Sequence, residues 1–305
     1  MNINDTKNTS STFNQSTKNA VLAAKPSKKC CKKAHLLGLL LFGQVFGETE
    51  IRLVGENEHI LDHASGLLKS QVGVDVSPYR ESLSNQGKIS VRDGDICKKI
   101  LSYFGYDKKE LTSAYTILSE VFKCENCKIE FIKGVFLSCG NVSSPRKSYH
   151  LEFNVSYFNL SRELLYFLKG MSFEAKYTKR SSHYVIYYKE SEKIVDFLGL
   201  VGATKENFEY NNTLIAKDIR NNLNRLNNCE MANMTKQIMS ATKQIDAIKR
   251  LFADHGTDGL SEDLLETARL RIDNPDASLS QLAELHDPPV TKSCVNRRLK
   301  KLSEM

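Results

Sequence analysis

The sequence predicts an α+β fold, in which a duplicated domain with mostly antiparallel sheets precedes a small all-α domain. Three observations support this fold class: a motif that begins at Cys31 returns at Cys127, the segment 184–188 alternates as a strand does, and the chain ends in a series of short, capped helices. With 305 residues, of which 41% are hydrophobic, the chain is long enough for two domains with separate cores.

The repeated motif organises the first two hundred or so residues. The pattern Cys-Lys-x-x-x-Leu-x-Gly-x-x-Leu over residues 31–41 returns as Cys-Lys-x-x-x-Ile-x-Gly-x-x-Leu over residues 127–137, and each copy predicts a helix. The same elements are then expected after each copy: a strand (50–54; 149–156), a helix (58–71; 159–169), two strands and a closing helix (93–104; 190–199). Gly38 and Gly134 each weaken their helix by about 1 kcal/mol relative to Ala, so we expect the backbone of the other copy to approach them closely.

Two glycine-containing helices that each carry a small sheet resemble the LAGLIDADG homing-endonuclease architecture. The resemblance implies a saddle-shaped pair of sheets over DNA, with acidic residues at the helix ends that hold metal ions for phosphodiester hydrolysis. In this sequence the acidic positions align with Gly43 and Cys139, which supply no hard oxygen ligand. We therefore expect a degenerate nuclease scaffold without catalytic residues. An active Mg²⁺-dependent homing endonuclease is the enzymatic alternative.

The charge distribution favours a polyanionic partner. The net charge is +7, and basic residues dominate both the segment 1–47 and the segment 291–301. The longest apolar run, residues 36–42, is too short to cross a membrane, and a cytoplasmic, nucleoid-associated protein is expected. The eight cysteines are scattered through a long chain, which predicts reduced thiols.

Four cysteines allow two interpretations. Because the repeat places Cys31 and Cys127 at equivalent helix starts, they could meet Cys30 and Cys124 across the pseudo-twofold axis and bind Zn²⁺. The short spacing within each pair argues against suitable ligand geometry. The sequence analysis therefore favours small buried thiols, with no metal and no cofactor.

The C-terminal segment predicts three helices in a helix-turn-helix arrangement. Ser261 begins the first helix, Ser278 and Gln281 form a capping box that opens the second, and Thr291 precedes the third. In the third helix Val295, Leu299 and Leu302 fall on one face, so the opposite face is expected to contact DNA. The candidate DNA-binding residues are Ser278, Gln281, Thr291, Lys292, Ser293, Asn296, Arg297, Arg298, Lys300 and Lys301.

Between the two domains we expect a polar helix that is interrupted near Asn227 and Asn228. Its segment 218–233 is rich in Asn and Arg, which suits either contacts with nucleic acid or, as the sequence slightly favours, a polar hinge.

The whole chain resembles the WhiA family of bacterial regulators, which join a degenerate LAGLIDADG domain to a C-terminal helix-turn-helix. The matching residues are Cys30-Cys31-x-Lys33-Ala34, Gly134-x-Phe136-Leu137 with Gly140, Tyr149-His150-Leu151-Glu152, the segment 218–233, and the segment 279–302. Gly43-Gln44 departs from the Asn-Gly that is more frequent in that family.

The resemblance implies a DNA-binding transcription regulator that acts in cell division, in chromosome segregation and, in sporulating lineages, in sporulation. The expected domains are a polar lead with a short helix (1–24), a LAGLIDADG-like domain (25–210, with repeats 30–123 and 126–205), a helical linker (211–259) and a helix-turn-helix domain (260–305).

A protein-interaction scaffold at the nucleoid is the third class of function. The strands of the second repeat carry tyrosines that are expected to be exposed and that suit a protein interface as well as a DNA groove. They are Tyr157, Tyr177, Tyr184, Tyr187 and Tyr188. Double-stranded DNA remains the principal expected partner, a second regulatory protein is a further one, and the sequence leaves the oligomeric state open.

Overall fold

The computed structural model describes residues 12–55, 57–83, 86–106, 115–257 and 259–305. The chain divides into two compact units, Met1–Ala216 and Lys217–Met305. The helix α8 (Thr204–His255) contributes residues to both units. Within the described residues, no helix is both long enough and apolar enough to cross a membrane.

The first unit consists of two repeats with the same order of elements, preceded by α1 (Phe13–Ala23). The first repeat contains α2 (Lys29–Leu41), β1 (Val45–Phe46), β2 (Ile51–Gly55), α3 (Glu58–Leu67), β3 (Arg80–Leu83), β4 (Gln86–Val91) and α4 (Gly94–Phe104). The second contains α5 (Asn126–Cys139), β5 (Gly140–Val142), β6 (Leu151–Val155), α6 (Phe158–Gly170), β7 (Lys176–Arg180), β8 (His183–Tyr188) and α7 (Ser191–Leu200).

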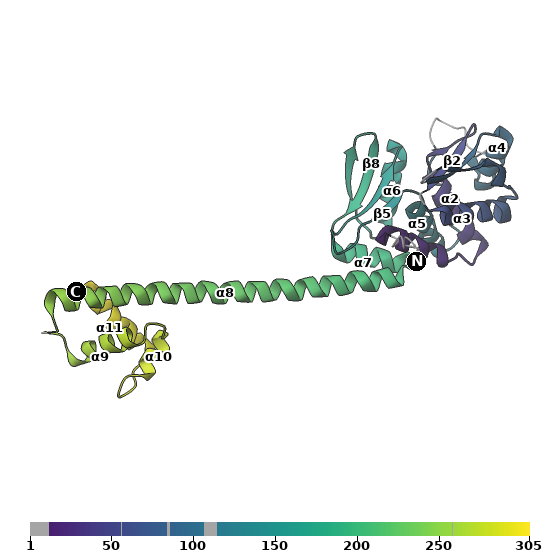
Figure 1. Cartoon of the computed structure of the whole chain (residues 1–305). Coiled ribbons are helices and arrows are strands. Elements are labelled where there is room, and N and C mark those ends of the chain that lie inside the picture. The colour runs from purple at the N-terminus through teal and green to yellow at the C-terminus, as the bar shows by residue number, and fades with distance from the viewer. Residues whose placement is uncertain (1–11, 56, 84–85, 107–114, 258) are drawn as a thin grey trace, which may run out of the picture. The chain divides into compact units, whose positions relative to one another are not determined.

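Both sheets are antiparallel and have equivalent strand orders, β1-β2-β4-β3 in the first repeat and β5-β6-β8-β7 in the second. The predicted α+β duplication is therefore confirmed. In Figure 1 the helices α2 and α5 lie between the two halves of this unit. Each central helix therefore leads directly into the sheet of its own repeat.

The central helices meet at their glycines. A Cβ atom on Gly38 would overlap the carbonyl oxygen of Phe131 and would lie 3.0 Å from the amide nitrogen of Val135. In the symmetric position, a Cβ on Gly134 would overlap the carbonyl oxygen of His35 and would lie 2.8 Å from the nitrogen of Leu39. The predicted close approach of the two copies is therefore correct, and it explains why each helix tolerates a central glycine.

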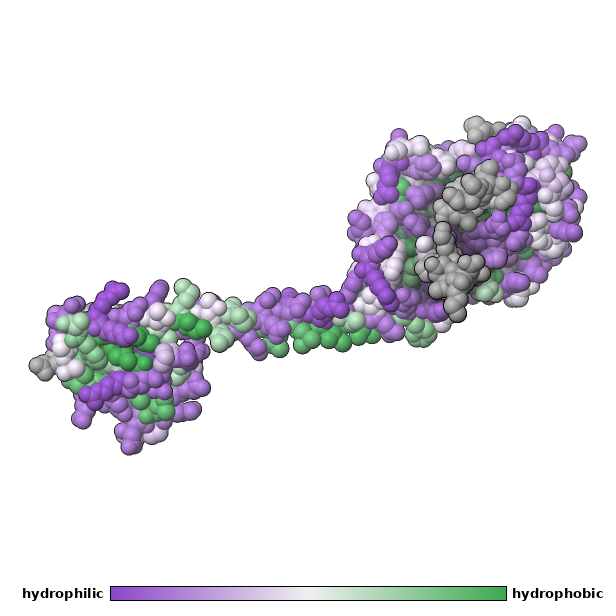
Figure 2. Space-filling view, in the orientation of Figure 1, coloured by the Kyte–Doolittle hydropathy of each residue, from purple (hydrophilic) through white to green (hydrophobic). Residues whose placement is uncertain are grey.

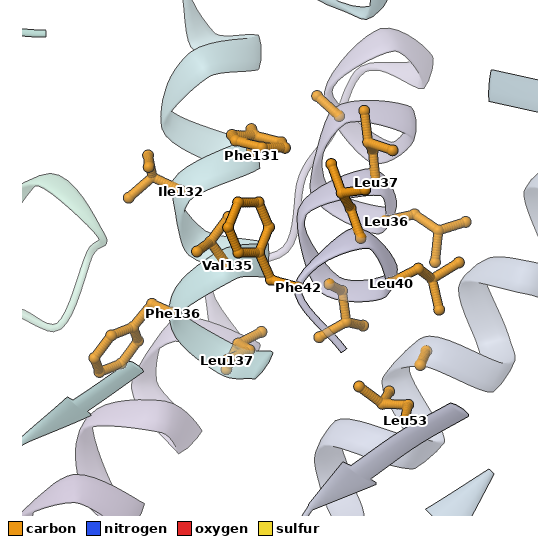
Figure 3. Packing of buried hydrophobic residues seen from close by; sticks show 14 of the residues in the cluster. Leu36, Leu37, Leu40, Phe42, Leu53, Phe131, Ile132, Val135, Phe136 and Leu137 are labelled. Carbon is orange, nitrogen blue, oxygen red and sulfur yellow. The ribbon is translucent and has the colours of Figure 1, made fainter. Parts of the chain in front are cut away.

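Apolar side chains surround this contact. Figure 3 shows Leu36 and Leu37 of α2 beside Phe131 and Val135 of α5, and all four are fully buried. The ring of Phe42, which follows α2, packs edge-on against Phe131 with a centroid separation of 6.0 Å. Close packing of this kind makes the interface sensitive to any added volume.

A buried polar chain crosses the same interface, and nothing in the sequence pattern indicated it. Lys133 Nζ donates to Glu130 Oε1 at 2.8 Å, Glu130 Oε2 lies 3.2 Å from His35 Nδ1, and His35 Nε2 lies 3.1 Å from His63 Nε2. Burial by itself raises the pKa of Glu130, but the hydrogen bonds from His35 and Lys133 outweigh it, so the pKa is lowered. The carboxylate is therefore kept ionised between the two repeats.

The sheet of the second repeat corrects one expectation. Tyr188, which was expected to be exposed, is only 3% exposed, and its hydroxyl donates to the carbonyl oxygen of Phe173 at 3.0 Å. Tyr184 and Tyr187 are half-buried, whereas Tyr157 and Tyr177 are exposed. Tyr188 lies two residues after the buried Ile186, so strand alternation places both side chains on the face of β8 that packs on the core.

The helix α8 runs through Asn227 and Asn228 without the predicted interruption. It also exposes large apolar side chains, so it is less polar than expected, and Figure 2 shows apolar surface along this helix. These residues are Ile215, Ile219, Leu223, Leu226, Met231, Met234, Ile238 and Met239.

The second unit packs three further helices against the end of α8. They are α9 (Glu262–Asp273), α10 (Leu279–Glu284) and α11 (Lys292–Glu304), as the capping signals predicted. Ile248 and Leu251 of α8 join a buried cluster with residues from all three helices. The remaining members of this cluster are Leu264, Ala268, Leu282, Ala283, Val295, Leu299 and Leu302.

The substitution Gly38→Ala is expected to destabilise the first unit by about 1–3 kcal/mol, because the new methyl group meets backbone atoms that cannot move independently. Gly66→Ala in α3 is the matched control, since no atom lies within 4 Å of its Cβ position. There alanine is expected to be neutral or to stabilise the helix by up to about 1 kcal/mol. Urea unfolding followed by circular dichroism measures the free energy of unfolding of both variants. Equal changes in that free energy would contradict the close approach of α2 and α5 at Gly38.

The first unit is expected to lose stability as the pH falls from about 6.5 to about 4. Burial, assisted by the charges of His35 and Lys25, lowers the pKa of His63 from 6.5 to about 4. Between these pH values the His63 imidazole is protonated in the unfolded chain but mostly neutral in the folded chain, so a fall in pH favours unfolding.

His63→Gln retains a hydrogen-bond donor for His35 and should flatten the dependence of the melting temperature on pH in this range. His59→Gln, an exposed position on the same helix, serves as the control. If the two variants show the same pH profile as the unmodified chain, His63 is not the responsible group.

Candidate nucleic-acid interface

The helix α11 separates an apolar face from a basic one. Thr291 caps its start by accepting a hydrogen bond from the backbone N–H of Cys294 at 3.2 Å, and Val295, Leu299 and Leu302 point into the core. Six of the candidate DNA-binding residues are exposed on this helix: Lys292, Ser293, Asn296, Arg297, Lys300 and Lys301. Lys300 makes only an exposed ion pair with Glu304 at 3.6 Å, which is easily exchanged for another anion.

Arg298 differs from these six residues. Its side chain is only 14% exposed, and Nη2 donates to Asp263 Oδ2 of α9 at 2.8 Å. Arg298 lies three residues after Val295 and four before Leu302, so helical periodicity places it beside the buried face of α11. The structure places Arg298 in the packing of the module, in contrast to the prediction that it faces DNA.

Ser278 and Gln281 use their polar atoms within the fold. The N–H of Gln281 donates to Ser278 Oγ at 3.3 Å, and the N–H of Ser278 donates to Gln281 Oε1 at 2.8 Å, which completes the predicted capping box. These residues therefore set the start of α10, and Gln281 remains exposed at the surface.

Two buried polar residues of the module were missed by the sequence analysis. Arg271 is 1% exposed and donates to the carbonyl oxygens of Asn274 and Pro275, which holds the turn after α9. The helical spacing of Leu264, Ala268 and Arg271 was an available signal for this burial. His286 lies between Thr267 Oγ1 and the carbonyl oxygen of Leu282, at 2.8 Å from each.

The two positions that the homing-endonuclease resemblance aligns with acidic residues, Gly43 and Cys139, lie at the C-terminal ends of the central helices. Gly43 follows α2, and Cys139 is the last residue of α5. Both line an open hollow of about 1210 Å³. The charged and titratable side chains that share this hollow are Lys18, Arg146, Lys147, His183 and Glu209.

The residues at these helix ends do not fit a divalent cation. Gly43 has no ligand atom, and a Cβ there would lie 3.0 Å from the carbonyl oxygens of Leu40 and Arg52. Burial raises the pKa of the Cys139 thiol to about 12, so it stays protonated at neutral pH. Lys18 donates to the carbonyl oxygen of Leu137 at 3.3 Å, which places an ammonium group at the end of α5. Among the residues that the structure describes, Glu209 is the single carboxylate that lines this hollow, whereas Mg²⁺ needs several oxygen ligands.

The sheet of the second repeat presents a second basic surface. All five residues of β7 are exposed, and they include Lys176, Lys179 and Arg180. Tyr177 stacks on Tyr184 with centroids 6.3 Å apart, and Lys179 Nζ lies 5.7 Å from the ring centroid of Tyr184. Basic residues interleaved with aromatic rings are typical of surfaces that contact nucleic acids.

The remaining group of potential ligands lies at the opposite, N-terminal end of the central helices. The thiols of Cys30, Cys31, Cys124 and Cys127 all lie within 4.8 Å of one another. The sequence analysis expected the short spacings to give poor ligand geometry, but the fold brings the four sulfur atoms together.

Comparisons with known proteins agree with this architecture. Residues 223–305 match the WhiA C-terminal HTH domain, and residues 128–220 match the WhiA LAGLIDADG-like domain. A "Probable cell division protein WhiA" of Caldicellulosiruptor saccharolyticus is 35% identical over 306 residues, which cover 96% of this chain and 94% of that protein. A protein of the same description from Clostridium novyi is 39% identical over 211 residues, which cover 68% of this chain and 67% of that protein.

Solved structures show the same fold. The full-length DUF199/WhiA from Thermatoga maritima matches with a TM-score of 0.61 at 22% identity, covering 96% of this chain and 97% of that chain. The N-terminal LAGLIDADG domain of DUF199/WhiA matches with a TM-score of 0.50 at 18% identity, covering 63% of this chain and 90% of that chain. The two central helices with their paired sheets, the C-terminal helices and the nearly full-length relative lead to one conclusion: this chain belongs to the WhiA family.

Proposed function

We propose that this chain is a non-enzymatic, sequence-specific regulator of transcription that binds double-stranded DNA through α11. The observation that carries the proposal is the exposed row of Lys, Arg, Asn and Ser side chains on α11, opposite its buried face. Such a helix fits the major groove, where Arg and Asn can make bidentate contacts with base edges. The lysines neutralise phosphates and supply affinity that depends on salt.

The proposed process is cell division together with chromosome segregation and, in sporulating lineages, sporulation. Relatives are described as probable cell division proteins, which supports the first of these roles. A DNA-binding regulator acts at the nucleoid, and we place this chain there in the cytoplasm. The basic surface around β7 is proposed to strengthen DNA binding or to recruit a second regulatory protein.

A genome-wide binding map of the full-length protein, compared with a chain that lacks residues 261–305, tests the proposal and supplies the recognition site. Specific enrichment should disappear in the truncated chain because α11 is removed. Specific enrichment that persists in the truncated chain would indicate that the first unit recognises DNA. Unspecific enrichment with both chains would support the scaffold alternative.

Arg297→Ala is expected to weaken binding to the mapped site, measured by fluorescence anisotropy across a series of salt concentrations. If Arg297 contacts a phosphate, the slope of log K against log[salt] should become shallower by about one. If it contacts a base, discrimination against a mismatched site should fall by about 1–3 kcal/mol.

The neighbouring Arg298→Ala provides the matched control, because this side chain pairs with Asp263 inside the module. It should lower the stability of the second unit by about 1 kcal/mol and leave the salt slope unchanged. If Arg298→Ala alters the salt slope while Arg297→Ala does not, the proposed orientation of α11 is wrong.

The full-length protein is expected not to cleave its bound site when Mg²⁺ is supplied, because the helix ends offer Gly43 and a protonated Cys139 thiol where the fold would need carboxylates. Incubation of a supercoiled plasmid that carries the mapped site, followed by gel electrophoresis, measures nicking and linearisation. Mg²⁺-dependent cleavage that persists through purification would establish the endonuclease alternative.

A further inference from the structure

We propose that Cys30, Cys31, Cys124 and Cys127 form a structural zinc site that joins the two repeats at the starts of α2 and α5. Such a site is separate from DNA binding by α11 and from the degenerate nuclease positions. Its four ligands would come from two segments that are distant in sequence, one at the start of each repeat.

The distances from Cys124 Sγ to the other three sulfur atoms are close to those of a tetrahedral thiolate site. Cys124 Sγ lies 3.7 Å from Cys30 Sγ, 3.6 Å from Cys31 Sγ and 3.5 Å from Cys127 Sγ, and all four sulfurs lie within 4.8 Å of one another. Zinc–sulfur bonds of about 2.3 Å in a tetrahedron place the sulfurs about 3.8 Å apart. A disulfide bond is about 2.05 Å long, so these four cysteines are free thiols at separations that suit ligands of a shared metal ion.

The contact between the central helices explains why the cysteines converge. Backbone contact at Gly38 and Gly134 holds α2 and α5 in register, and the helix starts that carry the cysteines are brought together by the same pairing. Cys31 and Cys127 are buried, whereas Cys30 and Cys124 are half-buried. The cluster is therefore mostly enclosed, and the two partly exposed residues, Cys30 and Cys124, mark its side nearest the surface.

The surrounding charge suits a group with excess negative charge. Four thiolates with one Zn²⁺ carry a net charge of about −2, and lysines flank both pairs of cysteines at Lys28, Lys29, Lys32, Lys123 and Lys128, against the single acid Glu125. The positive ends of two helix dipoles point towards the same place. Neither Lys28 nor Glu125 makes a side-chain cap, so neither N-cap residue competes with the thiolates for the helix-end N–H groups of α2 and α5.

The ligand set also points to a structural rather than a catalytic metal. Four cysteine sulfurs fill all positions of a tetrahedral zinc ion and leave none for water or substrate. Soft thiolates select zinc or iron over Mg²⁺, and a mononuclear site with sulfurs this close together favours zinc over an iron–sulfur cluster, whose irons need more space. The bound ion would cross-link the two repeats and increase the free energy of unfolding of the first unit.

Elemental analysis of the full-length protein, purified without chelators and under reducing conditions, tests the site. We expect about one zinc per chain in the unmodified protein and at least a tenfold lower content in Cys124→Ser, whose sulfur neighbours the other three. Cys229→Ser removes an exposed thiol on α8 and is the matched control, which should retain all of its zinc. Full zinc content in Cys124→Ser, or no zinc in the unmodified protein even after incubation with zinc chloride and gel filtration, would overturn the proposal.

Cobalt substitution keeps the test decisive if Cys124→Ser does not fold. The unmodified protein, treated with a chelator and then supplied with Co²⁺ alone, should develop the intense thiolate-to-cobalt and tetrahedral d–d absorption bands, and added zinc should remove them. A spectrum of octahedral cobalt, or purified protein that contains iron and sulfide, would contradict a tetrahedral zinc site. Chelation should also lower the melting temperature of the first unit, and an unchanged value would contradict its structural role.

Discussion

The contact between the backbones of α2 and α5 is the constraint on which the first unit depends. At Gly38 and Gly134 each helix accepts a carbonyl oxygen of the other in the place of a side chain. This pairing fixes the separation of the helices, and because each helix leads into its own sheet, it also relates the two sheets. The buried chain from Lys133 through Glu130 and His35 to His63 crosses the same contact, so polar and apolar packing are joined there.

The two ends of this helix pair have different chemistry. At the C-terminal end, where a nuclease of this fold needs carboxylates, the chain has Gly43 and a protonated Cys139, and Lys18 supplies a positive charge to the carbonyl end of α5. At the N-terminal end, four thiols converge among lysines. The helix pair thus lacks a set of oxygen ligands for a hard cation among the described residues at one end, whereas four sulfur atoms that suit a soft cation meet at the other.

In the second unit, packing against α9 divides neighbouring basic residues into two groups. Arg297 is exposed, whereas Arg298 pairs with Asp263 and is mostly buried. Capping residues that could also have faced a ligand, Ser278 and Thr291, use their hydroxyl oxygens to accept backbone hydrogen bonds. The set of exposed polar side chains that are available to a partner is therefore smaller than the set of polar residues in this segment.

Local patterns in the sequence determined the elements of this protein. The repeated motif predicted the duplication, and its central glycines predicted a close helix pair, because both copies can be read directly from the sequence. The capping residues and the spacing of Val295, Leu299 and Leu302 predicted the C-terminal helices, because these signals depend on residues within a few positions. Tertiary structure decided what depends on contacts between distant residues. It buried Tyr188 and Arg271, turned Arg298 towards Asp263, linked His63 to His35, and brought Cys30 and Cys31 to Cys124 and Cys127. The physical reason is that each residue of a helix is rotated by about 100° from the previous one, so the sequence indicates which face a side chain lies on. Which residue it contacts on that face depends on how the elements pack together.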